Sequence, residues 1–126
     1  MNSNNKSVIL VVDDISSNLV LMKAFLRLRD CEVLTAASGD EALKMAGEVK
    51  PDVVLLDIMM PKMDGFEVLA RLRGNPATKD VKVLMVSALS STMDIKNAMD
   101  LGADGFIAKP IIASKLYEEL DRVLGC

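Results

Sequence analysis

Five polar side chains in this sequence stand at the ends of short apolar runs and have the right chemistry to bind a metal ion and a phosphoryl group. They are Asp13, Asp14, Asp57, Ser87 and Lys109. Short apolar runs separated by helical patterns are typical of buried parallel strands. Ligands of open α/β sheets bind beyond the carboxyl ends of such strands. We therefore expect three carboxylates, a hydroxyl and an ammonium group to meet at one edge of a sheet.

The three aspartates predict a site for a hard divalent cation. An all-oxygen ligand set favours Mg²⁺, with Mn²⁺ as a possible substitute, over Zn²⁺. The chain contains no histidine, which excludes imidazole-bound metals and histidine-assisted nucleophiles. Asp13 and Asp14 are neighbours, so both can face one ion only if the backbone turns after the first strand. The alternative is that one of them simply caps the first helix.

Asp57 is the best candidate for a nucleophile because it ends a fully apolar strand at the same expected edge. A carboxylate oxygen can attack phosphorus and form an acyl phosphate. The Lys109 ammonium can pair with Asp57 and then with a phosphoryl oxygen, and the Ser87 hydroxyl can donate to another such oxygen. The alternatives are a turn-forming aspartate, a surface lysine before Pro110 and an ordinary strand-end serine.

The apolar and helical patterns predict five strand-then-helix units. The expected strands are 8–12, 32–36, 53–57, 82–87 and 105–108. Ser38 with Glu41, Asp64 and Ser91 are predicted to cap three of the helices. Strict alternation implies right-handed crossovers, hence an α/β fold with a doubly wound, five-stranded parallel sheet and helices on both faces. We expect one domain over 1–126, with a flexible N-terminal tail at 1–7.

The composition limits the class of protein. With 126 residues, 51% of them hydrophobic and 26% charged, the chain can form a globular core. A net charge of −3 argues against direct binding to nucleic acid, which needs a basic face. No apolar stretch approaches the roughly 20 residues that span a bilayer, and the polar start of the chain does not resemble a signal peptide. The sequence thus favours a cytoplasmic protein without a membrane partner.

The chain resembles the receiver domain of two-component response regulators, and its length and spacing are nearest to the single-domain chemotaxis type. Four motifs carry the resemblance: VVDD at 11–14, LLDIMMPKMDG at 55–65, SAL at 87–89 and GADGFIAKP at 102–110. The resemblance covers essentially the whole chain. It implies a flavodoxin-like (βα)₅ fold and a phosphorelay signalling switch. Such a domain catalyses only its own phosphorylation and dephosphorylation and is not otherwise an enzyme.

The resemblance also implies a role for each site residue. Asp57 would be the phosphoacceptor, and Ser87 and Lys109 would hold the phosphoryl group. Phe106 takes the position of an aromatic switch, with an ordinary core aromatic as the alternative, and the Lys109–Pro110 peptide is expected to be cis. Mg²⁺ would be bound by the following groups: Asp14 directly, Asp13 mostly through water, the Asp57 side chain and the Met59 backbone carbonyl.

The resemblance also implies two kinds of partner, one that donates the phosphoryl group and one that receives the signal. Because the chain has no histidine, the donor would be a separate histidine kinase or histidine phosphotransfer protein, or a small acyl phosphate. The output would be a changed face of the fourth helix, fifth strand and fifth helix, roughly 91–126, that regulates an effector protein or output domain.

Three alternative functions fit the sequence less well. A phosphatase of the haloacid dehalogenase type needs a second acid at the position of Met59. A flavodoxin-like electron carrier needs aromatic residues to hold its flavin, but aromatics are only 3% of this chain. A receiver-like domain that binds partners without phosphorylation would not need the three acids and Lys109.

Overall fold

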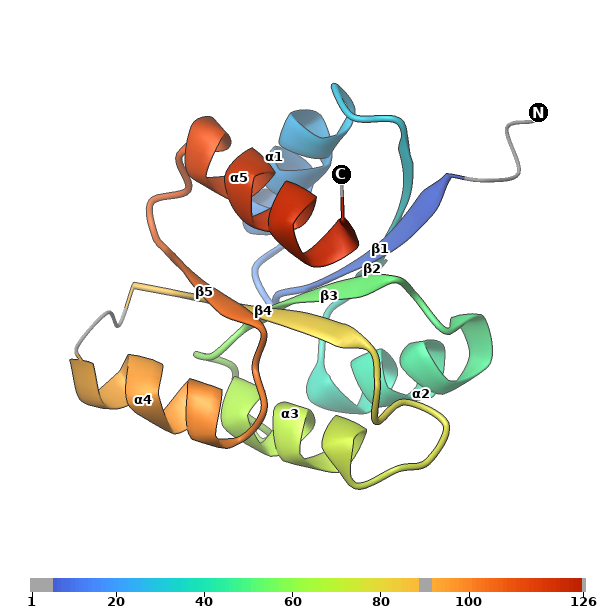
Figure 1. Ribbon diagram of the computed structural model, residues 1–126, viewed down its shortest axis with the longest axis vertical. Helices are drawn as coiled ribbons and strands as arrows, with labels where there is room; N and C mark the ends of the chain where they lie inside the picture. The colour runs from blue at the N-terminus through green and yellow to red at the C-terminus, as the bar shows by residue number, and fades with distance from the viewer. Residues whose placement is uncertain (1–5, 89–91, 126) are drawn as a thin grey trace.

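The computed structural model describes residues 6–88 and 92–125 and shows a single parallel sheet between two layers of helices (Figure 1). All strand pairs are parallel, and the strand order is β2-β1-β3-β4-β5. This confirms the predicted doubly wound sheet. The strands are β1 (Ser7–Val12), β2 (Cys31–Ala36), β3 (Val53–Asp57), β4 (Lys82–Ser87) and β5 (Gly105–Ala108).

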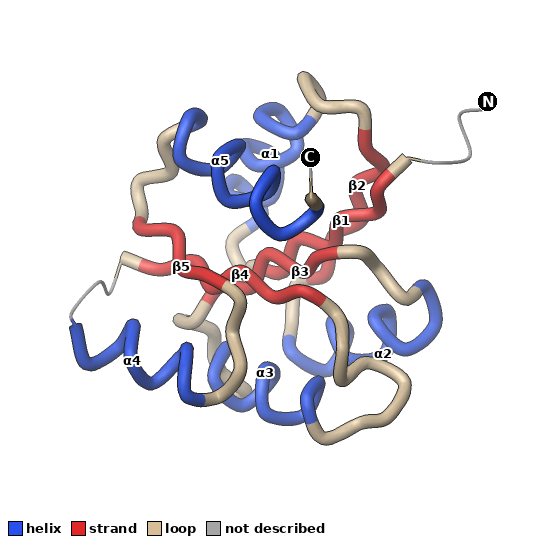
Figure 2. The backbone as a smooth tube through the Cα atoms, viewed as in Figure 1, coloured by secondary structure: helices blue, strands red, loops and turns tan. Residues whose placement is uncertain are grey.

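The helices divide between the two faces of the sheet, with α1 and α5 on one face and α2, α3 and α4 on the other (Figures 1 and 2). Their bounds are α1 (Ser16–Leu26), α2 (Gly39–Val49), α3 (Gly65–Arg73), α4 (Thr92–Asp100) and α5 (Ala113–Leu124). None of the helices in the described part of the chain has the length and apolar character needed to cross a bilayer.

The central strand β3 shows why the sheet is buried on both sides. All five of its residues are buried, and successive side chains point to opposite faces. Val53 and Leu55 belong to the core beneath α1 and α5. Val54 and Leu56 belong to the core beneath α2, α3 and α4. The sequence of β3 is therefore a continuous apolar run, and Asp57 lies where that run reaches the edge of the sheet.

The predicted strands agree with the observed ones to within one residue. β1 begins at Ser7 and therefore includes the last residue of the tail expected at 1–7. The first five residues of that tail lie outside the described part of the chain.

Two of the predicted helix caps are present. The Ser38 hydroxyl accepts a hydrogen bond from the Glu41 N–H at 3.2 Å, and the Glu41 carboxylate accepts one from the N–H of Ala37 at 2.6 Å. The Asp64 carboxylate accepts from the Glu67 N–H at 3.0 Å, at the start of α3. The cap expected at Ser91 falls outside the described residues.

The C-terminal end of α2 offers a stability prediction. Lys50 follows the helix in a left-handed conformation, with φ 54° and ψ 66°, which costs a residue with a Cβ about 1–2 kcal/mol. Glycine adopts this conformation freely but loses some entropy on folding. Lys50→Gly should therefore raise the free energy of unfolding by about 1 kcal/mol, measured by urea denaturation. A decrease would contradict the strain assigned to Lys50.

Candidate functional site

The ends of β1 and β3 place two of the acids side by side. Val12 pairs with Leu56 in the parallel register, so Asp13 and Asp57 each follow a paired residue at the carboxyl edge. Both are buried, with 5% and 3% of their surface exposed, whereas Asp14 is exposed. One carboxylate oxygen from each of the three aspartates lies within 4.8 Å of the other two. The structure thus brings together the three acids that the sequence pointed to.

A backbone turn after β1 makes this arrangement possible. One oxygen of Asp13 accepts the Ile15 N–H at 2.9 Å, and the other accepts the Asn18 side-chain amide at 3.1 Å. The first helix starts at Ser16 with Ile15 in the cap position, and no side chain caps it. The alternative that Asp13 or Asp14 merely caps α1 is therefore wrong. Asn18 could not be singled out from the sequence, because its only signal is an amide in the first helical turn after the paired acids.

Lys109 reaches this pair of buried acids from the end of β5. Its Nζ lies 3.2 Å from Oδ2 of Asp13 and 3.4 Å from Oδ1 of Asp57. The Lys109 N–H donates to the Ser87 carbonyl at 2.9 Å, which fixes the end of β5 against that of β4. The Lys109–Pro110 peptide is cis, as the resemblance implied. These ion pairs rule out the alternative of an ordinary surface lysine.

Ser87 and Phe106 lie on the neighbouring strands β4 and β5. Ser87 is the last residue of β4 and is fully buried. Phe106 lies in β5, partly buried, and packs against the core on the α4 side of the sheet. It also lines a groove of about 610 Å³ with Ile95 of α4 and Glu118 of α5. Met59 follows Asp57 closely, and its N–H donates to Oδ1 of Asp57 at 3.4 Å.

The electrostatics of the site favour an added cation. Burial raises the pKa of the Asp57 carboxyl, and the charge of Asp13 raises it further. Lys109 and the Met59 N–H act in the opposite direction but do not cancel this rise. With all groups ionised, three carboxylates and one ammonium leave a charge of −2 at a largely buried site. Oxygen ligands at this spacing and this surplus charge fit a divalent cation such as Mg²⁺.

The loop between β3 and α3 is held close against the strand end. The Gly65 N–H donates to the Ile58 carbonyl at 2.9 Å. A Cβ on Gly65 would lie 2.5 Å from the Asp57 carbonyl oxygen and 2.7 Å from Cα of Ile58. Because both contacts are backbone atoms, no side-chain movement can make room. Glycine at this position is thus part of what places Asp57.

This lack of space at Gly65 predicts the effect of adding one methyl group there. Gly65→Ala should lower the free energy of unfolding by about 2 kcal/mol, in the range for an overpacked interior. Equilibrium denaturation in urea measures this change. Gly47→Ala is the matched control, because a Cβ on Gly47 meets nothing within 4 Å and alanine favours the helix. Equal stability of the Gly65→Ala protein and the parent would contradict the close contact.

A cavity of about 180 Å³ opens beside the acids. Asp13, Asp57 and Lys109 form its polar side, and Leu21 and Ile111 contribute to its apolar side. The site is therefore accessible from the space between α1 and the segment that follows β5.

The fold and site together define a class: a five-stranded α/β domain that carries an acidic site with one lysine at the carboxyl edge of its sheet. The profile of the response regulator receiver domain matches residues 9–121. The chain therefore belongs to the family of response regulator receiver domains of two-component systems, and its role is in signal transduction. The resemblance inferred from the four motifs, and the flavodoxin-like fold, are confirmed.

Individual relatives agree with this assignment. Response regulator PleD of Caulobacter vibrioides is 45% identical over 103 residues, which are 82% of this chain and 23% of PleD. Chemotaxis protein CheY4 of Vibrio cholerae superposes with a TM-score of 0.88 at 33% identity, over 94% of this chain and 98% of that one. The receiver domain of sensor histidine kinase PA1611 from Pseudomonas aeruginosa, which has a magnesium ion in its active site cleft, gives a TM-score of 0.87 at 26% identity, over 96% and 99%. The chain spans about a quarter to a half of the curated relatives that it matches.

Proposed function

We propose that this domain is a phosphorelay switch that accepts a phosphoryl group on Asp57 in a Mg²⁺-dependent reaction. The donor is a histidine kinase or a histidine phosphotransfer protein. The observation that carries the proposal is the buried Asp57 carboxylate, 3.4 Å from the Lys109 ammonium, in an acidic site open to a cavity. In an open α/β sheet this is the edge at which ligands bind.

The residues of the chain have complementary tasks in the transfer. An oxygen of Asp57 attacks the phosphorus of the donor phosphohistidine, and the P–N bond breaks with its electron pair on the imidazole nitrogen. Lys109 pairs with Asp57 beforehand and with a phosphoryl oxygen afterwards. The hydroxyl of Ser87 donates to a second phosphoryl oxygen. Hydrolysis of the acyl phosphate by water returns Asp57 to its carboxylate and resets the switch.

The acids have the task of holding the cation. Asp14 would bind it directly, Asp13 mostly through water, and Asp57 and the Met59 carbonyl would complete the protein ligands. When bound, Mg²⁺ neutralises the charge that would otherwise repel an incoming phosphoryl group. The oxygen spacing within 4.8 Å and the magnesium ion in the receiver domain of PA1611 support this assignment.

The output follows from where Ser87 and Phe106 lie. Phosphorylation adds roughly one negative charge at Asp57, which favours a state with Ser87 and Lys109 drawn toward the phosphoryl group. Ser87 ends the strand that leads into α4, and Phe106 lines the groove between α4 and α5. The α4–β5–α5 face then presents a changed surface to an effector protein or output domain. The two states differ in population, and phosphorylation shifts the balance.

Intact-mass spectrometry after incubation with acetyl phosphate tests this proposal. The parent chain should gain one phosphoryl group with Mg²⁺ and none with EDTA, and Asp57→Asn should gain none under either condition. Uptake by the Asn variant would overturn Asp57 as the acceptor. No uptake by the parent would favour a domain that only binds partners, and steady release of phosphate from phosphate esters would favour a phosphatase.

A further inference from the structure

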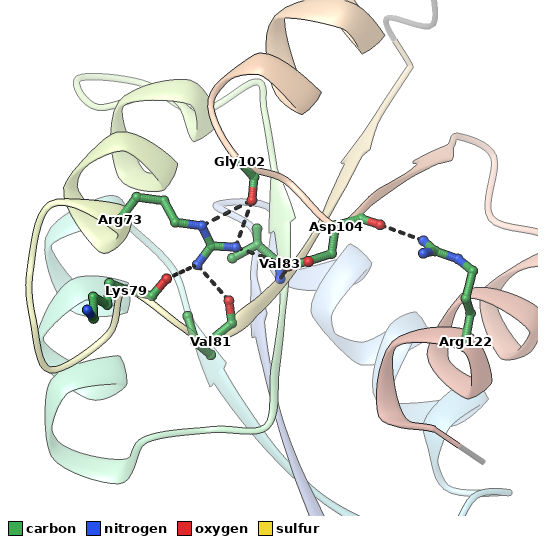
Figure 3. Close-up of polar contacts among 7 residues, drawn as sticks. All are labelled: Arg73, Lys79, Val81, Val83, Gly102, Asp104 and Arg122. Carbon is green, nitrogen blue, oxygen red and sulfur yellow. Dashed lines mark hydrogen bonds and ion pairs between the residues drawn. The ribbon is translucent and has the colours of Figure 1, made fainter.

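Arg73, at the C-terminal end of α3, uses all of its N–H donors on groups at the edge of the sheet opposite the acidic site (Figure 3). Its Nε and one terminal nitrogen donate to the Gly102 carbonyl at 3.0 and 2.8 Å. That terminal nitrogen also donates to the Asp104 carboxylate at 3.0 Å. The other terminal nitrogen donates to the carbonyls of Lys79 and Val81 at 3.1 and 2.6 Å. We call these five residues the Arg73 cluster.

The cluster fixes the C-terminal end of α4. Gly102 has a φ of 100°, and its N–H donates to the Met99 carbonyl at 3.0 Å, while the Ala103 N–H donates to the Ala98 carbonyl at 3.0 Å. These bonds end the helix in a left-handed turn. A Cβ on Gly102 would lie 3.1 Å from Nε of Arg73, so the guanidinium lies directly against this turn.

Asp104 connects the same turn to the sheet. Its carboxylate accepts the Val83 N–H at 2.8 Å, and its own N–H donates to the Val83 carbonyl at 2.7 Å. Its carbonyl accepts from Arg122 of α5 at 2.5 Å. The segment after α4 is therefore held by α3, β4 and α5 together.

The body of α4, by contrast, has little packing to hold it. Ala98 is its one buried residue, and Met93 and Met99 are 65% and 47% exposed. The helix begins on the side where β4 ends and returns to the side where β5 begins (Figure 1). A displacement that starts at Ser87 thus enters α4 at its N-terminal end, far from the end that is fixed.

We propose that the Arg73 cluster is a fixed pivot, about which α4 turns when the acceptor site is occupied. The inference rests on the proposed phosphoacceptor function for the cause of the motion, but the fixed end itself does not depend on it. Met93 lies nine residues before Gly102 and Met99 lies three before it. At 1.5 Å per residue these are about 13 and 5 Å from the pivot. A rigid helix should therefore move about three times as far at Met93 as at Met99.

Distances between pairs of nitroxide labels test the pivot by pulsed electron paramagnetic resonance. The background carries Cys31→Ser and Cys126→Ser, and one label stands at Met93→Cys or Met99→Cys. The second label stands on an exposed lysine of a helix on either face, Lys44→Cys or Lys23→Cys. Spectra are compared with and without Mg²⁺ and beryllium fluoride, which mimics the phosphoryl group. The label at Met93→Cys should be displaced about three times as far as the label at Met99→Cys. Equal displacement at the two positions, or no displacement in a chain that takes up a phosphoryl group, would overturn the pivot.

A second comparison uses the protein without beryllium fluoride and so does not require phosphorylation. Arg73→Gln should at least double the width of the distribution of distances between the label at Met99→Cys and the second label. Arg73→Lys, which keeps the charge beside Asp104 but cannot reach all the carbonyls, should do the same if the glutamine variant does not fold. Arg71→Gln is the control, because Arg71 on the same helix pairs only with Glu67 in the described contacts. Unchanged widths in the Arg73 variants would overturn the pivot, even if Asp57 proves to be the acceptor. If Asp57 takes up no phosphoryl group, the proposed function fails, and these widths alone decide whether the end is fixed.

Discussion

Lys109→Gln should slow phosphoryl uptake by Asp57 at least about 100-fold, the usual cost of losing one group that stabilises charge in a transition state. The reason is that the Lys109 ammonium lies 3.4 Å from Asp57 and would follow the charge onto the phosphoryl oxygens. A neutral amide can donate a hydrogen bond but cannot offset that charge. The measurement is the time course of intact mass with acetyl phosphate at a fixed Mg²⁺ concentration. A rate within threefold of the parent would contradict this role.

The same substitution should lower the free energy of unfolding in EDTA by about 2 kcal/mol, because it leaves two buried acids without their cation. The expected loss is smaller than the full cost of breaking a buried pair, because 23% of the Lys109 side chain is exposed and water screens its charge. Mg²⁺ should restore much of the stability without restoring the rate. Lys96→Gln, which breaks an exposed pair with Asp100, is the control and should change neither quantity.

Mg²⁺ should itself stabilise the folded chain. At 100 times its dissociation constant, a ligand that binds only the folded state raises the free energy of unfolding by about 2.7 kcal/mol. Urea denaturation at increasing Mg²⁺ concentrations measures this increase. Asp14→Asn should remove most of it while leaving the stability in EDTA nearly unchanged, because Asp14 is exposed and supplies mainly a metal ligand.

Asp40→Asn provides the matched control for this experiment. Asp40 is also an exposed acid, at the start of α2, and lies outside the group of acids that could hold an ion. The stabilisation by Mg²⁺ should be the same in this variant as in the parent. A parent chain whose stability does not depend on Mg²⁺, or an Asp14→Asn variant that responds fully, would contradict the metal site.

The sequence by itself determined the order of the elements and the edge at which the site lies. Both depend on local patterns: an apolar run such as 53–56 that stops at a charged residue indicates a buried strand that reaches the edge of the sheet. In a parallel sheet all carboxyl ends lie at one edge. Asp13, Asp57, Ser87 and Lys109 were therefore bound to lie at this edge, and the strand order β2-β1-β3-β4-β5 then placed Asp13 next to Asp57.

Only the tertiary structure decided which side chains and backbone groups of different segments come into contact. It showed that Asn18 holds Asp13, that a Cβ on Gly65 would collide with the Asp57 carbonyl, and that Arg73 reaches Gly102. In the sequence Arg73 is one more charged residue near a helix end. Its partners are mostly carbonyls, which every residue carries, so no pattern of side chains reveals them. The apolar runs and the helical spacing specify which segments form strands and helices, but the contacts between their backbones arise only when the layers pack.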